Sequence, residues 1–486
     1  MAPFSVDSAG AASPRPGLLI NGERVLTDSV VPVIDPAAGE PFAEVHMAGA
    51  DECTAAVDAA AGAADAWAAT SPRFRADILR RAYEAMTDQH EPLARLITRE
   101  NGKALPDARA EVTYAAEFFR WFAEEAVRIQ GEFRTAPAGD KRIIVTQHPV
   151  GPSLLVTPWN FPAAMATRKW APALAAGCTT ILKPASETPL TALAIAEILV
   201  AAGLPPGVVN VVPASPAGPR VSGMLHDTRI KNLSFTGSTE VGVALLHEAA
   251  DQVVRTSMEL GGNAPFVVLE DADIDDAVQG ALVAKLRNGG AACTAANRFY
   301  VHAAVAMEFT EKLTFAMNGL RLGPGLHDGV DIGALVSVAE RDKVAALVDK
   351  ASSSGARITT GGKIPDGAGA FYPPTVLADL DPTNDLLANE IFGPVAPIVT
   401  FESVDDAVRL ANDTPYGLIS YVYGQAFQDA FAVADRIESG MVAINRGTVS
   451  DPAAPFGGMK ESGIGREGGF AGIHEFLESK YIAASI

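Results

Sequence analysis

From about Gly151 onward, short segments rich in β-branched residues alternate with alanine-rich helical segments, and this alternation restricts the fold more than any other feature of the chain. The expected strands are 153–157, 180–183, 208–212, 232–236 and 265–269. Helical stretches such as 170–176 and 191–202 lie between them. Strand–helix–strand units at this spacing predict an α/β fold, with a doubly wound parallel sheet and helices on both of its faces.

The part of the chain before this alternation is predicted to be mainly helical. Positions 51–89 are expected to form two helices, with Ser71 as the N-cap of the second. A long helical pattern at 104–129 carries clustered aromatic residues, for which core packing is the simplest explanation. Segment 131–150 is typical of a hairpin, and a second α/β region follows at 272–445. Since 486 residues exceed the roughly 250–300 at which one core stops growing, we expect at least two domains.

Charge and cysteine content argue against several classes of function. The formal net charge of −20 repels phosphate backbones, so we expect no nucleic-acid partner. Cys53, Cys178 and Cys293 match no zinc or disulfide spacing, which favours a reducing compartment and a protein without a metal. No apolar run reaches the roughly 18–20 residues of a membrane span, and the N-terminus lacks the pattern of a secretory signal. We therefore expect a soluble cytoplasmic protein with no membrane partner.

Two familiar motifs are present only in part. The glycines of 463–468 spell GxGxxG, the dinucleotide fingerprint, but only 18 residues follow them, too few for the helix and acidic residue that the fingerprint requires. We interpret this segment as a turn-rich connection. His247-Glu248 begins like a zinc-protease helix, but Asp251 stands where the second histidine is needed, so no zinc site is predicted.

Reactive and polar residues stand at positions where chemistry is expected. Cys293 is surrounded by small residues that allow close approach of a ligand, although a lone cysteine is more often an inert buried residue. Glu259 lies between the apolar residues Met258 and Leu260 and before a glycine pair, where a carboxylate must be paired, desolvated or facing a cavity. Asn160 follows the end of a predicted strand, where open α/β sheets bind ligands. Gly237 and Ser238 begin a helical stretch and offer backbone N–H groups to a phosphate.

Taken together and in this order, these segments resemble the aldehyde dehydrogenase superfamily from about residue 16 to the C-terminus. The matching motifs are PWNFP (158–162), KPA (183–185), FTGST (235–239), ELGG (259–262), EIFGPV (390–395) and PFGG (455–458). The resemblance implies a Rossmann-like cofactor domain, an α/β catalytic domain and a small β oligomerisation arm. The corresponding bounds are 1–130 with 150–261 for the first, 262–462 for the second, and 131–149 with 463–486 for the arm. Such an arm implies a homodimer or homotetramer.

The resemblance also assigns a mechanism. Cys293 would attack the aldehyde as a thiolate, and the Asn160 amide and the Cys293 backbone N–H would hold the oxyanion of the thiohemiacetal. Loss of hydride to the nicotinamide leaves a thioester, which water activated by Glu259 would hydrolyse. Lys169 would support this site.

For the cofactor, the resemblance places several residues around the nucleotide. Lys183 and Ser186 would bind the adenosine ribose, and Gly237 and Ser238 the pyrophosphate. Trp159, Leu260 and Phe392 would line the pocket, and Glu390 would bind the nicotinamide ribose. A carboxylate at position 186 would repel a 2′-phosphate, whereas Ser186 can donate to it beside the charge of Lys183. We therefore favour NADP over NAD.

Within the superfamily, the chain is most similar to the NADP-type succinate-semialdehyde dehydrogenases. This likeness is carried by EFFRWFAEEA (117–126), by 158–178 and by GIGREGG (463–469). Arg168 and Arg287 match the arginines that hold the substrate carboxylate there, and Ser450 matches a hydrogen-bonding serine. Succinate semialdehyde is therefore the expected substrate.

Alternatives remain at this point. Another aldehyde, such as glutarate semialdehyde or an aromatic aldehyde, would use the same chemistry. A CoA-acylating enzyme would not need Glu259, and a non-catalytic binding protein would not need Cys293, Glu259 and Asn160 together. The chain also departs from the family pattern. Ala291 replaces a glutamine before the nucleophile, and Trp170 stands beside Arg168 where a smaller aliphatic residue is usual.

Overall fold

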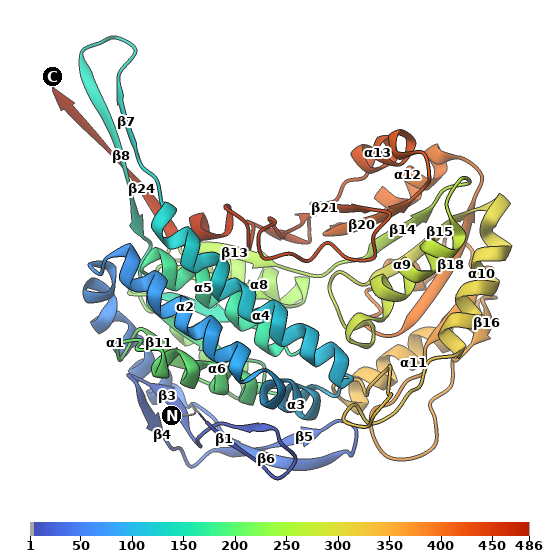
Figure 1. Ribbon diagram of the computed structural model, residues 1–486, viewed down its shortest axis with the longest axis horizontal. Coiled ribbons are helices and arrows are strands. Elements are labelled where there is room, and N and C mark those ends of the chain that lie inside the picture. The colour runs from blue at the N-terminus through green and yellow to red at the C-terminus, as the bar shows by residue number, and fades with distance from the viewer. Residues whose placement is uncertain (1–3, 486) are drawn as a thin grey trace.

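The computed structural model describes residues 4–485, and within them the chain forms two large sheets with helices packed on both (Figure 1). The first sheet has the strand order β23-β13-β12-β9-β10-β11-β3-β4. Its strands are β3 Leu18–Ile20, β4 Glu23–Val25, β9 Ser153–Val156, β10 Thr180–Lys183, β11 Val209–Val211, β12 Asn232–Thr236, β13 Arg255–Glu259 and β23 Gly463–Ile464. Strands β13, β12, β9, β10 and β11 run parallel, which confirms the predicted parallel sheet.

Helices cover both faces of this sheet. One face packs against α1 (Ala50–Ala68), α7 (Ala217–Leu225) and α8 (Thr239–Ala250). The other face packs against α2 (Pro72–Asp88), α3 (His90–Asn101), α4 (Leu105–Glu125), α5 (Pro162–Ala176) and α6 (Pro189–Ala201). Ser71 caps α2 as expected, because its side chain accepts a hydrogen bond from the Phe74 N–H at 3.2 Å.

The aromatic residues of α4 pack as the sequence predicts. Phe118, Phe119 and Phe122 are at most 1% exposed, within the hydrophobic core that α4 shares with α5. Trp170 is fully buried in the same core, so its bulk is accommodated by packing between helices.

The second large sheet has the order β16-β17-β18-β15-β14-β20-β21, and most of its strands run parallel. Its strands are β14 Ala264–Val268, β15 Ala296–His302, β16 Arg357–Thr360, β17 Thr375–Ala378, β18 Val395–Phe401, β20 Ile419–Tyr423 and β21 Met441–Ile444. The helices around it are α9 Ile274–Leu286, α10 Ala303–Asn318, α11 Val338–Ser353, α12 Val404–Asn412 and α13 Phe427–Arg436. The chain passes from the first sheet to the second between β13 and β14.

A ribbon of antiparallel strands projects from the body of the molecule (Figure 1). It consists of β7 (Glu132–Thr135), β8 (Lys141–Pro149) and β24 (Leu477–Ser485), in the order β24-β8-β7. The hairpin expected at 131–150 is therefore present. The segment 463–486, assigned as a whole to the arm, is divided: β23 pairs with β13 in the first sheet, and only β24 joins the ribbon. The domain bounds themselves stay a prediction.

Smaller elements connect these parts. The short sheets pair β1 (Ser5–Val6) with β2 (Ala12–Ser13), β5 (Val30–Asp35) with β6 (Glu40–His46), and β19 (Tyr416–Gly417) with β22 (Met459–Lys460). The 3₁₀ turns are η1 Ala126–Arg128, η2 Arg287–Gly290, η3 Asp385–Ala388 and η4 Gly472–Phe476. Among residues 4–485, no helix combines the length and apolar character needed to cross a membrane.

Candidate active site

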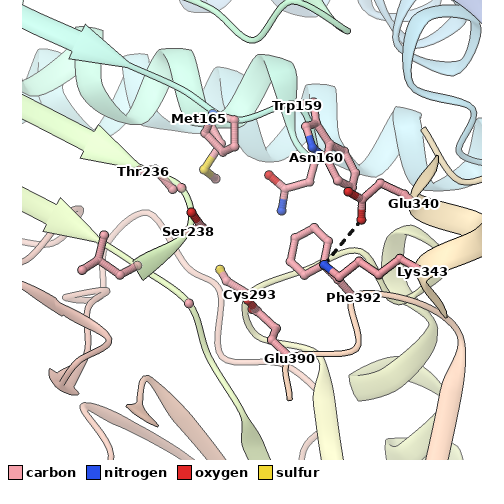
Figure 2. Close-up of a pocket in the computed structure, with 14 residues that line it drawn as sticks. Trp159, Asn160, Met165, Thr236, Ser238, Cys293, Glu340, Lys343, Glu390 and Phe392 are labelled. Atoms are coloured by element: carbon pink, nitrogen blue, oxygen red, sulfur yellow. Dashed lines mark ion pairs between the residues drawn. The ribbon is translucent and has the colours of Figure 1, made fainter. Parts of the chain in front are cut away.

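A cavity of about 190 Å³ opens where the carboxyl ends of β9 and β12 face loops and a helix around the second sheet (Figure 2). Many of the residues singled out from the sequence lie in its wall. These are Trp159, Asn160, Gly237, Ser238, Leu260, Cys293, Glu390 and Phe392. The position agrees with the rule that open α/β sheets bind ligands at the carboxyl ends of their strands.

Cys293 lies in the loop between η2 and β15, and its side chain is only partly exposed. Burial raises the pKa of the Cys293 thiol to about 12, and the positive charge of Arg168 opposes this shift. This shift favours the protonated thiol over the thiolate. Attack by this sulfur requires a base that takes the proton as the new bond forms.

The Asn160 side chain points into the cavity toward Cys293 (Figure 2). Its amide nitrogen donates to the carbonyl of Ala291 at 3.2 Å, and its amide oxygen accepts from the Phe161 N–H at 3.1 Å. The Asn288 amide bridges this region, since it donates to the backbone carbonyls of Asn160 at 2.7 Å and of Ala291 at 2.9 Å. Ala291, which replaces the usual glutamine, therefore still takes part in fixing the cysteine loop through its backbone.

Glu259 is the last residue of β13 and is 3% exposed. Neither of its carboxyl oxygens has a hydrogen-bond partner. Burial, and then the negative charge of Glu467, raise the pKa of Glu259 well above its ordinary value, while the charges of Arg168 and Lys169 lower it. The carboxyl lies outside the cavity wall described above, although the next residue, Leu260, forms part of it. A buried carboxyl with a raised pKa is a base of useful strength near neutral pH.

A buried ionic cluster lies beside these residues. Lys169 donates to Glu467 at 2.6 Å and to the Ser234 hydroxyl at 2.9 Å, and Arg168 pairs with the other oxygen of Glu467 at 2.6 Å. The Arg168 guanidinium also lies 4.0 Å from the Phe456 ring centroid, and one of its terminal nitrogens has no partner. The sequence did not indicate Glu467, because an acid within a glycine-rich turn gives no sign of the partner it meets.

Arg287 and Ser450 are brought together although 163 positions separate them. The guanidinium donates to the Ser450 hydroxyl at 3.0 Å and lies 5.0 Å from the Phe161 ring centroid. Phe161 directly follows Asn160, so this pair lies next to the element that carries the predicted oxyanion donor. A cation and a hydroxyl held this way can bind a carboxylate.

The residues predicted for the cofactor divide into two groups. Ser238 caps α8 by accepting from the Val241 N–H at 3.4 Å, and it places the N-terminus of that helix at the cavity. Lys183 ends β10 and is 6% exposed, and burial lowers its pKa. Ser186 is half-buried in the loop that follows. Lys183 and Ser186 are not part of the cavity wall.

Glu390 accepts a hydrogen bond from the Gly262 N–H at 3.1 Å, and burial raises its pKa to about 7. The Trp159 and Phe392 rings meet edge to face, with their centroids 5.3 Å apart. A helix N-terminus suited to phosphate, a carboxylate suited to ribose hydroxyls and aromatic walls together fit a nicotinamide dinucleotide.

Two charged residues in the wall were missed by the sequence analysis. Glu340 and Lys343 of α11 face the cavity from the side of the second sheet and form an ion pair at 3.7 Å (Figure 2). From the sequence, an acid and a lysine three positions apart look like an ordinary pair on a solvated helix face. Among the described residues, no group of three or more His, Cys, Asp or Glu side chains could hold a metal ion.

Comparison with known proteins gives near-complete matches. The model of the aldehyde dehydrogenase family matches residues 25–482. The chain is 53% identical to succinate-semialdehyde dehydrogenase of Paenarthrobacter nicotinovorans over 91% of this chain and 98% of that protein. It is 45% identical to glutarate-semialdehyde dehydrogenase of Pseudomonas putida over 96% and 97% of the two chains. The crystal structure of an NADP-dependent enzyme of E. coli superposes with a TM-score of 0.96 at 46% identity, covering 97% of this chain and 98% of that one.

Proposed function

Because the chain belongs to the aldehyde dehydrogenase family, we propose that it oxidises succinate semialdehyde to succinate with NADP as the electron acceptor. As a member of the family, with relatives at this identity over nearly its whole length, the chain catalyses oxidation of an aldehyde with a nicotinamide cofactor. The observation that carries the substrate proposal is the Arg287–Ser450 pair near the cysteine loop, with the buried Arg168 nearby.

The first step is attack of the Cys293 sulfur on the aldehyde carbon. The thiol proton goes to a base, for which the raised pKa of Glu259 is suited. The Asn160 amide and the Cys293 backbone N–H donate to the oxygen that becomes negative. The chemistry that a bound nicotinamide supplies here is acceptance of hydride from the attacked carbon.

Hydrolysis of the resulting thioester completes the reaction. Glu259 first releases the thiol's proton to solvent and then takes a proton from water, which attacks the thioester carbonyl. The acid leaves, and the proton held by Glu259 passes to the departing sulfur and restores the Cys293 thiol. Lys169 and Arg168 supply positive charge near Glu259 and stabilise its ionised form. Glu467 is the counter-ion of both cations, and its own negative charge raises the pKa of Glu259.

NADP is proposed over NAD from the residues around the adenosine side. Lys183 supplies a positive charge, and Ser186 offers a hydroxyl donor where a carboxylate would repel a 2′-phosphate. The E. coli structure that superposes on this chain is described as that of an NADP-dependent enzyme.

The decisive experiment is steady-state kinetics with succinate semialdehyde and with butanal, which has the same chain length and no carboxylate, each with NADP and with NAD. We expect kcat/KM for succinate semialdehyde to exceed that for butanal by about 100-fold, as for a charged group held by two or more donors. Equal values would overturn the substrate proposal.

Mass analysis of the trapped enzyme is expected to show acylation of the peptide containing Cys293, with no acylation in Cys293→Ala.

Glutarate semialdehyde is a second candidate, favoured by the relative of that name at 45% identity. Its carboxylate suits the same arginines, and one extra methylene changes binding by only about 10–200-fold. Comparing kcat/KM for the two semialdehydes assigns the preferred chain length.

We also propose a homodimer or homotetramer. The projecting ribbon of Figure 1 carries apolar side chains that a second copy would cover. They include Phe133 at 72% and Tyr481 at 55% exposure. Light scattering of the purified chain measures the mass, and a monomer would contradict this proposal.

A further inference from the structure

The hydroxyl of Tyr114, on α4, is buried and has no hydrogen-bond partner. The Arg287 guanidinium lies 5.5 Å from the centroid of the Tyr114 ring. The Tyr114 ring also packs edge to face against the Phe118 ring, with their centroids 5.0 Å apart. The Arg168 guanidinium lies 5.8 Å from the centroid of the Phe118 ring. Tyr114 therefore belongs to the same cluster as both arginines proposed to hold the substrate carboxylate.

Tyr114 is also within electrostatic reach of the nucleophile. Burial raises the pKa of its phenol, the charges of Arg168 and Arg287 lower it, and Cys293 is among the groups that raise it. Tyr114 therefore lies among the charged groups around Cys293, although its side chain is not part of the cavity wall described above.

No described residue accepts a hydrogen bond from the Tyr114 hydroxyl. Arginine has N–H donors and no acceptor, so neither guanidinium can receive the phenolic proton. A buried hydroxyl without an acceptor is less favourable than the phenylalanine that would fit the same space. A carboxylate ligand, which carries acceptors only, would supply the acceptor that the Tyr114 hydroxyl lacks.

An orphaned buried group is not by itself informative. The indole N–H groups of Trp67 and Trp170 are unpartnered as well, but those side chains are at most 2% exposed within the hydrophobic core. Tyr114 differs because its side chain is only partly buried and contacts Arg287, the cation that the family resemblance assigns to the substrate carboxylate.

We infer that Tyr114 is a specificity-determining residue, whose hydroxyl donates a hydrogen bond to the substrate carboxylate alongside Arg287 and Ser450. This inference rests on the proposed oxidation of a carboxylated semialdehyde. Tyr114 is on α4, a helix that packs on the first sheet, whereas Arg287 and Ser450 come from the part of the chain that surrounds the second sheet.

The test compares Tyr114→Phe with the unchanged enzyme on succinate semialdehyde and on butanal. We expect kcat/KM for succinate semialdehyde to fall about 10–100-fold, mainly through a higher KM, because the carboxylate is bound equally in the ground and transition states. Activity on butanal is expected to stay within twofold. Tyr372→Phe removes a buried tyrosine hydroxyl from the core of the second sheet, and it serves as the matched control with unchanged kinetics on both substrates.

The outcomes separate this inference from the proposed function. If the unchanged enzyme does not prefer succinate semialdehyde over butanal, the proposed function fails and the inference fails with it. If that preference exists and Tyr114→Phe retains it in full, only the inference is overturned. Equal loss on both substrates, or a lower melting temperature than the unchanged enzyme, would show that the hydroxyl serves the fold and would also overturn it.

Discussion

Gly262 packs against the nucleophile loop so closely that a Cβ on this residue would overlap the carbonyl oxygen of Cys293. The Gly262 N–H also donates to the Glu390 carboxylate at 3.1 Å. One small residue between β13 and β14 therefore contacts both the loop that carries the sulfur and the carboxylate proposed to bind the nicotinamide ribose. These two contacts hold the Cys293 loop and the Glu390 carboxylate at a set distance from each other.

Replacing Gly262 with alanine is expected to displace the Cys293 loop. A shift of about 1 Å at a reacting group costs on the order of 100-fold in rate, so we expect a fall of that size in kcat/KM for every aldehyde. Gly62→Ala, on an exposed position of α1 where a Cβ meets nothing within 4 Å, is the control. It should keep full activity and gain about 0.5–1 kcal/mol of stability. Full activity in Gly262→Ala would show that the loop yields without cost.

Glu467→Gln is expected to move the pH dependence of the reaction toward acid. The negative charge of Glu467 raises the pKa of Glu259, and its removal also frees the charges of Lys169 and Arg168 to lower that pKa further. Activity that requires ionised Glu259 rises as pH increases through its pKa, so the rising limb of kcat/KM should begin at lower pH in the variant.

Two controls accompany this experiment. In Glu259→Gln the rising limb should disappear together with most of the turnover, because the titrating base is lost. Glu467→Gln should also lower the free energy of unfolding by about 3 kcal/mol, since it leaves buried cations without their counter-ion. An unmoved limb despite this loss of stability would mean that Glu259 does not control the profile.

Ser186→Glu is expected to reverse the cofactor preference. A carboxylate beside the ribose accepts from its hydroxyls and repels a 2′-phosphate, so the Kd of NADP should rise by about tenfold or more while that of NAD stays the same or falls. Fluorescence titration of the two nucleotides measures this directly. Glu187→Gln, at the exposed neighbouring position, should strengthen NADP binding modestly. Unchanged binding of NADP in Ser186→Glu would place the 2′-phosphate elsewhere.

Local pattern predicted the parts of this molecule that depend on short stretches of chain. The ends of β10 and β12 are as expected, because β-branched runs are bounded there by polar residues and helix starts. Strand β13 was missed, since Arg-Thr-Ser-Met-Glu shows neither strong alternation nor a continuous apolar run, and its burial comes from the strands on both sides.

The site shows the same division. Cys293 and Asn160 stand in recognisable motifs, and both line the cavity. Lys343 reaches that cavity from a helix of the other sheet, and Glu467 meets Lys169 across 298 positions. Tertiary packing brings these residues together, and the spacing of residues within a short segment does not predict it.

Glu100, on α3, provides the cap that α6 lacks in its own sequence. Thr188, at the N-cap of α6, makes no side-chain capping bond, whereas the two oxygens of Glu100 accept from the Leu190 and Thr191 N–H groups at 2.9 Å each. Glu100 is 1% exposed, so Glu100→Ala would leave both donors buried and unsatisfied. We expect a loss of about 2–4 kcal/mol in the free energy of unfolding, and about half of it for Glu100→Gln, which keeps one acceptor.

Ser186 lies in the loop that leads into α6, so a less ordered first turn of this helix should also raise the Kd of NADP. The kcat measured at saturating NADP should change less. Denaturant unfolding and nucleotide titration of Glu100→Ala measure the two effects. Glu124→Ala removes an exposed carboxylate from α4 and should change the free energy of unfolding by no more than about 0.5 kcal/mol. If Glu100→Ala were as stable as that control, the first turn of α6 would be held by packing alone, and the link between this carboxylate and the cofactor would be lost.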